Sequence, residues 1–152
     1  MAREQHIADA LVEKLKTLSG IRVYEQIMID KYTTYQFDYV GIFGSTDSRI
    51  VESLEDMSAV TNMGSIDVYL LCGNQVKKSP TLGKAKLRYA MQELCEKVEW
   101  CLQNLSIEDY KSDYEQTEFS KVHYIGNEPV TFNDDETMGL SIMTFRIFYT
   151  RF

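Results

Sequence analysis

Cysteine and histidine are the side chains here best suited to nucleophilic chemistry, and the chain has few of them. The sequence holds three cysteines, Cys72, Cys95 and Cys101, and two histidines, His6 and His123. A cysteine nucleophile needs a base held beside it, and Cys72 and His123, in two predicted strands, could meet across a sheet. Cys72 follows an apolar alternation that points into the core, so we expect a buried side chain instead.

The same residues make a poor metal site. Zinc needs three or four thiolate or imidazole ligands that converge on one point. Cys95 and Cys101 are six positions apart in a predicted helix, which places them about 240° apart around its axis. We therefore expect no metal site, and cysteines that pack as small apolar side chains in a reducing compartment.

Two further segments have the composition of ligand-binding loops without the required spacing. Asn133-Asp134-Asp135-Glu136 lacks the ligand spacing of an EF-hand, and we predict a solvated turn. Gly41-Ile42-Phe43-Gly44-Ser45-Thr46 has no lysine for a phosphate loop, and we predict a turn there too. No two carboxylates are marked as facing each other in a cleft. The sequence therefore predicts no catalytic residue, no cofactor and no enzyme activity.

The composition indicates one soluble globular domain. The chain has 152 residues, of which 44% are hydrophobic and 26% charged, enough to bury a core without disulfides or metals. Its net charge of −7 disfavours tight nucleic-acid binding and favours basic protein partners. The apolar runs are too short for a membrane span, and the start of the chain does not have the pattern of a signal peptide.

Two oppositely charged segments flank the longest predicted helix. Residues 77–88 carry five basic side chains and no acid, whereas residues 108–118 carry five acids and one lysine. They could be two solvated faces, or the basic end of one subunit could meet the acidic end of the next and fix its orientation. The basic stretch could alternatively line a channel for DNA. The residues of this candidate subunit interface are Lys77, Lys78, Lys84, Lys86, Arg88, Glu108, Asp109, Asp113, Glu115 and Glu118.

Two segments have the apolar spacing of helices. Residues 4–18 repeat apolar side chains on one side, which predicts a surface helix closed by Ser19-Gly20. Residues 81–105 keep one wide apolar face over five turns. A helix this long must lie across a sheet to bury that face.

Alternating segments predict the strands. Residues 21–29 and 33–43 are expected to form neighbouring strands of a hairpin, and residues 65–72 a third strand. Residues 119–125 predict a short strand closed by Gly126-Asn127, before a loop that holds Pro129. Residues 138–151 are apolar on both faces, which places this strand inside a sheet, with one of its covers possible from another subunit.

The expected fold is therefore a single α+β domain spanning residues 1–152. Its mixed, mostly antiparallel sheet has about five strands, packed by a short N-terminal helix and one long helix at about 81–105. Residues 45–63 follow neither period and predict an irregular insertion or arm, which is often a binding element.

The order of elements and both ends of the chain resemble the phage tail terminators, also called tail completion or minor tail proteins. The N-terminal segment Ile7-Ala8-Asp9-Ala10-Leu11-Val12-Glu13-Lys14-Leu15 is similar to their first amphipathic helix. The segment Phe145-Arg146-Ile147-Phe148-Tyr149-Thr150-Arg151 is similar to their final strand. The resemblance is one of pattern over most of the chain.

This resemblance implies a homo-hexameric ring in the virion tail or neck, assembled in the host cytoplasm. Such a ring caps the tail tube, stops its growth and docks on the head-side connector, and DNA passes through it. The implied partners are other copies of the chain, the tail tube protein and the connector protein. Alternatives are another neck or head–tail joining protein, a protein-binding module with an open sheet edge, or a small enzyme acting through Cys72 or the acidic loop.

Overall fold

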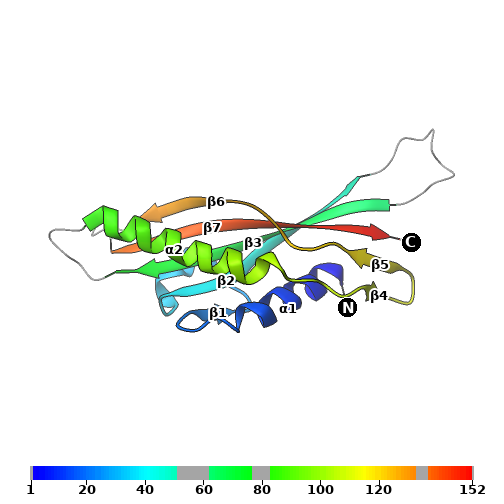
Figure 1. The fold of residues 1–152 in the computed structure, drawn as a ribbon, viewed down its shortest axis with the longest axis horizontal. Coiled ribbons are helices and arrows are strands. Elements are labelled where there is room, and N and C mark those ends of the chain that lie inside the picture. Colours follow the sequence, from blue (N-terminus) through cyan, green and yellow to red (C-terminus); the bar gives the residue numbers. More distant parts are fainter. Residues whose placement is uncertain (1, 51–61, 77–82, 133–136, 152) are drawn as a thin grey trace.

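Two helices pack on one face of a curved, seven-stranded sheet in the computed structural model (Figure 1). The structure describes residues 2–50, 62–76, 83–132 and 137–151. The helices are α1 (Arg3–Leu15) and α2 (Gly83–Gln103), with a short 3-10 helix, η1 (Ile29–Thr34). The strands are β1 (Arg22–Tyr24), β2 (Tyr39–Ile50), β3 (Asn62–Gln75), β4 (Tyr110–Lys111), β5 (Gln116–Phe119), β6 (His123–Phe132) and β7 (Met138–Arg151).

The centre of the sheet consists of three long antiparallel strands, β2, β3 and β7. On one side β1 pairs with β2, and on the other β7 pairs with β6 and, near its C-terminal end, with β5, which leads to β4. The expected α+β class and mostly antiparallel sheet are confirmed. The expected strand at 21–29 is reduced to the three paired residues of β1, and the additional strand β4 pairs through only two residues, too few for an alternating pattern to reveal.

Both helices and the long strands lie close to where the sequence places them. The expected helices at 4–18 and 81–105 correspond to α1 and α2, and the expected strands at 65–72 and 138–151 to β3 and β7. The two helices cover the inner face of the sheet, where the main core lies. Its buried side chains include Ile7, Leu11, Leu15, Val40, Ile66, Val68, Leu70, Leu94, Val98, Leu102, Met143, Phe145 and Ile147.

The predicted hairpin at 21–43 is wrong, because β1 runs parallel to β2. The segment between them folds over the outer face of the sheet and returns, held by backbone hydrogen bonds from Arg22 N to the Asp38 oxygen and from Ile27 N to the Ile42 oxygen, both 2.9 Å. Tyr35 and Phe37 stack on Tyr39 with ring centroids 5.4 and 5.0 Å apart. Their alternation therefore reflects packing on a second cluster and not a strand.

This second cluster, which we call the aromatic cluster, covers one end of the outer face. Its buried members are Ile27, Tyr39, Leu71 and Leu140, with Tyr24, Tyr35, Phe37, Phe43 and Ile142 around them. Leu70 and Leu71 are both fully buried, since one faces the main core and the other the aromatic cluster. β3 is therefore buried on both faces at this point.

The expected strand at 119–125 is two strands. β5 ends at Phe119 and β6 begins at His123, and between them Ser120 N donates to the Phe148 oxygen at 2.9 Å. Contrary to expectation, β6 continues through Gly126 and Pro129. It is an edge strand with two register shifts, so it tolerates a proline.

Part of the expected irregular segment is also strand. Residues 45–50 complete β2 and residues 62–63 begin β3, so the turn predicted at 41–46 is wrong, and residues 51–61 lie outside the described residues. The pairing of β2 with β3 shifts between Ile42 and Gly44. Such a bulge interrupts the alternation of faces, which is why this segment does not resemble a strand in sequence.

Gly73 makes room for the Tyr39 ring, because a Cβ atom there would lie 2.1 Å from Tyr39 Cζ. We expect Gly73→Ala to lower the free energy of unfolding by about 1–3 kcal/mol, as overpacking of a core does. Gly126→Ala is the matched control, since a Cβ there meets nothing within 4 Å. Urea unfolding measures both variants, and equal stability of the two would contradict the packing described for Tyr39.

Candidate assembly surface

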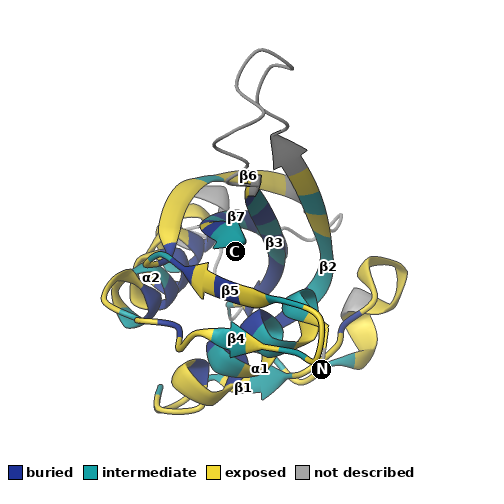
Figure 2. Cartoon of the chain, turned by 90° about the vertical axis from the view of Figure 1, so that its right-hand side faces the viewer, coloured by how far each residue is buried: buried dark blue, intermediate teal, exposed yellow. Residues whose placement is uncertain are grey.

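The outer face of the sheet beyond the aromatic cluster carries exposed and half-buried side chains in the described part of the chain. We call it the open face. The side chains of β3 and β7 alternate here, so Asp67, Arg146 and Phe148 lie opposite the core residues. Figure 2 shows β3 as the most buried strand, with intermediate and exposed residues on β2 and β6.

An ion pair occupies the middle of the open face. Asp67 and Arg146 are register partners across β3 and β7, and Arg146 donates from Nε at 2.8 Å and from Nη2 at 3.0 Å. The hydrogen bonds that Arg146 donates to Asp67, together with the negative charge of that carboxylate, raise the pKa of Arg146 above its ordinary value. A planar two-point pair of this kind fixes the orientation of both side chains.

Apolar side chains flank this ion pair. Phe148 is 40% exposed and stacks edge-on with His123, and Met63 is 44% exposed. Nearer the aromatic cluster, Tyr69 contacts the Phe43 ring and donates to Thr46 Oγ1 at 3.3 Å. Apolar side chains around a fixed polar pair are typical of a protein–protein contact surface.

Two strand edges lie beside the open face, in addition to the short strands β1 and β4 that end the sheet. Among the described residues, β2 pairs only with β3 from Gly44 to Ile50, and β6 pairs only with β7. Unpaired edges invite pairing with another chain unless proline, bulges or charge protect them. β6 has Pro129 and two register shifts, so β2 is the less protected edge.

A groove of about 470 Å³ follows the β2 edge. Glu4, Asp9 and Val12 of α1 form one wall, and Phe43 and Ser45 of β2 form the other. Glu4 accepts a hydrogen bond from Ser45, and Asp9 accepts one from Gln5. The described residues that line the groove include no cysteine or histidine. Its charged side chains are all carboxylates, so the groove is acidic.

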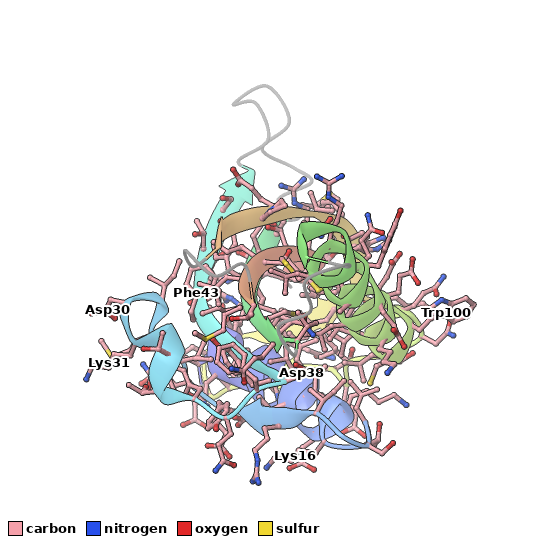
Figure 3. All side chains as sticks on the ribbon, turned by 90° about the vertical axis from the view of Figure 1, so that its left-hand side faces the viewer. Lys16, Asp30, Lys31, Asp38, Phe43 and Trp100 are labelled. Carbon is pink, nitrogen blue, oxygen red and sulfur yellow. The ribbon has the colours of Figure 1, made fainter. Side chains whose placement is uncertain are left out.

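The outer side of α2 carries two exposed aromatic residues. Trp100, the only tryptophan of the chain, is 72% exposed, and Tyr89 is 67% exposed. They are eleven residues apart, so they lie on nearly the same line along the helix. Figure 3 shows Trp100 projecting on the side away from Asp30 and Lys31 of η1. This pair is not among the residues expected from the sequence. Two aromatic residues outside the apolar face of a helix would have indicated it.

The start of α2, from residue 83, and the acidic segment at 108–118 lie toward opposite ends of the longest axis of the molecule (Figure 1). Lys77 and Lys78 lie outside the described residues, and Lys84 and Lys86 belong to the first turns of α2. The remaining exposed members are Arg88, Glu108, Asp109, Asp113 and Glu118. A contact between the segments therefore requires two chains.

Glu115 differs from the other residues of the candidate subunit interface, because it forms ion pairs with arginines of its own chain. Its carboxylate pairs with Arg3 and accepts from Arg151 Nε at 2.6 Å, and its side chain is only 13% exposed. The Arg3 guanidinium lies 4.9 Å from the centre of the Tyr149 ring, whose hydroxyl donates to Asp47 at 2.8 Å. These partners are far apart in sequence, so no local pattern reveals them. The network joins α1, β2, β7 and the start of β5.

Cys72 and His123 do not meet. Cys72 lies in the main core, whereas His123 is the register partner of Arg146 on the open face, so the two lie on opposite faces of the sheet. His6 contacts the Glu108 carbonyl at 3.0 Å, and Cys101 donates to the Lys14 carbonyl at 3.3 Å. Among the described residues, no three His, Cys, Asp or Glu side chains are grouped to hold a metal.

Cys72 and Cys95 both lie in the main core, where the Cys72 thiol donates to the Met143 sulfur at 3.5 Å and the Asn127 amide donates to the Cys95 sulfur at 3.7 Å. Interaction with Cys95 and burial raise the pKa of the Cys72 thiol. Interaction with Cys72, and also hydrogen bonds from Ser141 and Asn127, outweigh burial at Cys95 and lower its pKa to about 7. β3 supplies one thiol and α2 the other, so only the packed fold places both in this core.

Comparison with protein-family models and with curated proteins finds no match to this chain. Within the described residues, no helix has the length and apolar character needed to cross a membrane.

Glu115→Gln is expected to lower the free energy of unfolding by about 1–3 kcal/mol, since it removes the carboxylate that pairs with Arg151 and leaves Arg3 with Asp47 alone. Glu118→Gln removes the same charge from an exposed position nearby and is expected to change stability by less than about 0.5 kcal/mol. Thermal unfolding followed by circular dichroism gives the melting temperature of each variant. Equal melting temperatures would contradict a stabilising role for the network around Glu115.

Proposed function

We propose that this chain is a non-enzymatic structural protein of a phage virion, a tail terminator that forms a ring on the tail tube and joins it to the head-side connector. The resemblance of its two ends to that family suggests the role. The observation that carries the proposal is the open face bordered by two free strand edges. Both features supply surface for other chains and neither supplies chemistry.

The order of strands favours head-to-tail assembly. β2, β3, β7 and β6 follow one another in the sheet, and each neighbouring pair is antiparallel. The two edges therefore run in opposite directions, so β6 of one copy would lie antiparallel to β2 of the next. Contacts between unlike patches repeat around an axis and close into a ring when the rotation allows it.

Charge supports the same arrangement. The basic start of α2 and the acidic segment at 108–118 lie at opposite ends of one chain, where they are available to different neighbours. Their attraction would orient the copies. The net charge of −7 agrees with DNA passing through the ring without tight binding.

A second candidate is a protein-binding module. The acidic groove beside the β2 edge has the form of a site for an extended, basic peptide that adds a strand to the sheet. This function predicts a monomer or dimer that binds one such peptide for each chain.

Light scattering over a range of concentrations, with negative-stain images of the same sample, separates the two functions. A terminator is expected to give rings of about six copies. A protein that stays monomeric at every concentration, also when mixed with tail tubes, would contradict the terminator and favour the binding module.

Ser48→Lys is expected to weaken self-association about tenfold, because a lysine on a free strand edge opposes pairing. Ser48 is exposed on β2, in the part that pairs only with β3. Gln92→Lys adds the same charge on the exposed side of α2 and serves as the control. Sedimentation velocity measures both, and equal assembly of the two variants would place the contact elsewhere.

Replacing Lys84 and Lys86 together with glutamate is expected to weaken self-association, because two attractions become repulsions at the start of α2. Reversing Glu108 and Asp109 to lysine in the same chain should restore it. If the variant with Lys84→Glu and Lys86→Glu assembles as the wild type does, the two charged segments are merely solvated.

A further inference from the structure

The turn between β4 and β5 presents a fully exposed aromatic side chain on a fixed backbone. Tyr114 is 95% exposed, more than any other large apolar side chain of the described residues. Lys111 pairs with Gln116 at the base of the turn, and the Ser112 amide donates to the Glu115 oxygen at 2.9 Å. The Ser112 hydroxyl accepts the amide of Tyr114 at 3.3 Å and that of Glu115 at 3.1 Å. The backbone on both sides of Tyr114 is therefore held in place.

The turn is also fixed to the rest of the protein. Glu115 follows Tyr114 directly and pairs with Arg3 of α1 and with Arg151 of β7. A side chain displayed on a fixed backbone loses little conformational freedom when it binds. Tyrosine combines a large apolar ring with a polar hydroxyl and is enriched among the residues that dominate protein–protein binding. Tyr114 thus has the properties of an anchor residue, and its own chain buries almost none of it.

A cavity of about 580 Å³ near the start of β7 has walls suited to an aromatic ring. Tyr35 and Phe37 of the aromatic cluster line it, together with Met138, the first residue of β7. Gln36 and Gln75 also line it and supply amide groups that can hydrogen-bond to a phenolic hydroxyl. The volume lies within the range of cavities that hold small ligands, so one tyrosine side chain has room to enter.

The charge of this cavity is opposite to that of the turn. Arg22 lines the cavity and is exposed, whereas each cavity described beside α1 has more carboxylates than basic side chains. Asp38 lies next to the cavity, but its carboxylate accepts the Gln75 backbone amide at 3.1 Å. On the turn, Asp113 precedes Tyr114 and is exposed. A carboxylate on the turn and a guanidinium at the cavity attract each other and favour this pairing of surfaces.

The turn cannot reach the cavity of its own chain. Met138 lines the cavity at the first residue of β7, and Arg151, at the last residue, pairs with Thr117 of β5. A strand of 14 residues such as β7 extends roughly 45 Å. Figure 1 accordingly shows β4 and β5 at the opposite end of the molecule from the start of β7. A contact between the turn and the cavity therefore requires two chains.

We propose that Tyr114 of one copy inserts into the cavity beside Tyr35 and Phe37 of a second copy. In this contact Asp113 of the first copy pairs with Arg22 of the second. The inference rests on the end-to-end contact of the proposed function, and it names the residue that anchors that contact. Turn and cavity are unlike surfaces, so each copy offers the turn to one neighbour and the cavity to another. The charges orient the copies, and the buried ring supplies most of the affinity.

Photo-cross-linking of the purified full chain tests the contact directly. The photoreactive p-benzoyl-phenylalanine at position 114 keeps an aromatic side chain on the turn and links on irradiation to the residues that it touches. A mixture of isotopically light and heavy chains identifies links between two copies by mass spectrometry. We expect peptides that join residue 114 of one copy to residues 33–37 or 138 of another. The same amino acid in place of Tyr89, which is 67% exposed on α2, is the matched control and should give no such peptide.

Sedimentation velocity measures the contribution of the anchor. Tyr114→Ala is expected to weaken self-association about thirtyfold, as the loss of a dominant aromatic contact does. Tyr89→Ala removes an equally large exposed ring and is expected to change self-association by less than about twofold. Arg22→Asp should also weaken self-association, and Asp113→Arg in the same chain should restore it. All four positions are exposed, so unchanged circular dichroism spectra are expected for these variants.

The proposal fails if copies assemble and the cross-links from position 114 go to other residues. It also fails if Tyr114→Ala and Tyr89→Ala associate equally tightly. In both cases assembly through the strand edges still stands. A chain that stays monomeric, also when mixed with tail tubes, contradicts the inference and the proposed function together.

Discussion

In the described part of the chain both helices cover the same face of the sheet, and the rest of the structure depends on that asymmetry. α1 and α2 bury the inner side chains of β2, β3 and β7, and burial of apolar surface is the main favourable term in folding. On the outer face the aromatic cluster closes one end and leaves the open face. The final strand is therefore two-sided, with a buried row that includes Phe145 and Ile147 and an outer row that reaches solvent at Phe148. We propose that a second chain covers that row.

Specific polar contacts complete this arrangement. The network around Glu115 joins the first helix to the last strand, so both ends of the chain belong to one packed unit. Asp67 and Arg146 neutralise each other on the open face, beside apolar neighbours. A partner that docks there would therefore bury no unpaired charge. The surface is thus suited to docking.

The sequence predicts what repeats locally and misses what depends on distant contacts. The helical period identifies α1 and α2, and alternation identifies β3 and β7, because each has one face against a large core. The aromatic residues at 35–39 alternate equally well, yet they pack as a cluster on β2 and β3. The bulge at Phe43 and the proline in β6 conceal two strands. The pairing of Glu115 with Arg3 joins elements that only the fold brings together.

Assembly through the open face and the β2 edge is the central claim. Hydrogen–deuterium exchange, compared between dilute and concentrated protein, measures it directly. Backbone amides at residues 44–50 of β2, together with those around Phe148, should exchange more slowly in the assembled protein, while amides on the exposed side of α2 around Gln92 stay unchanged. If particles form and residues 44–50 exchange as fast as in the free chain, the contact lies on another surface and the account is contradicted.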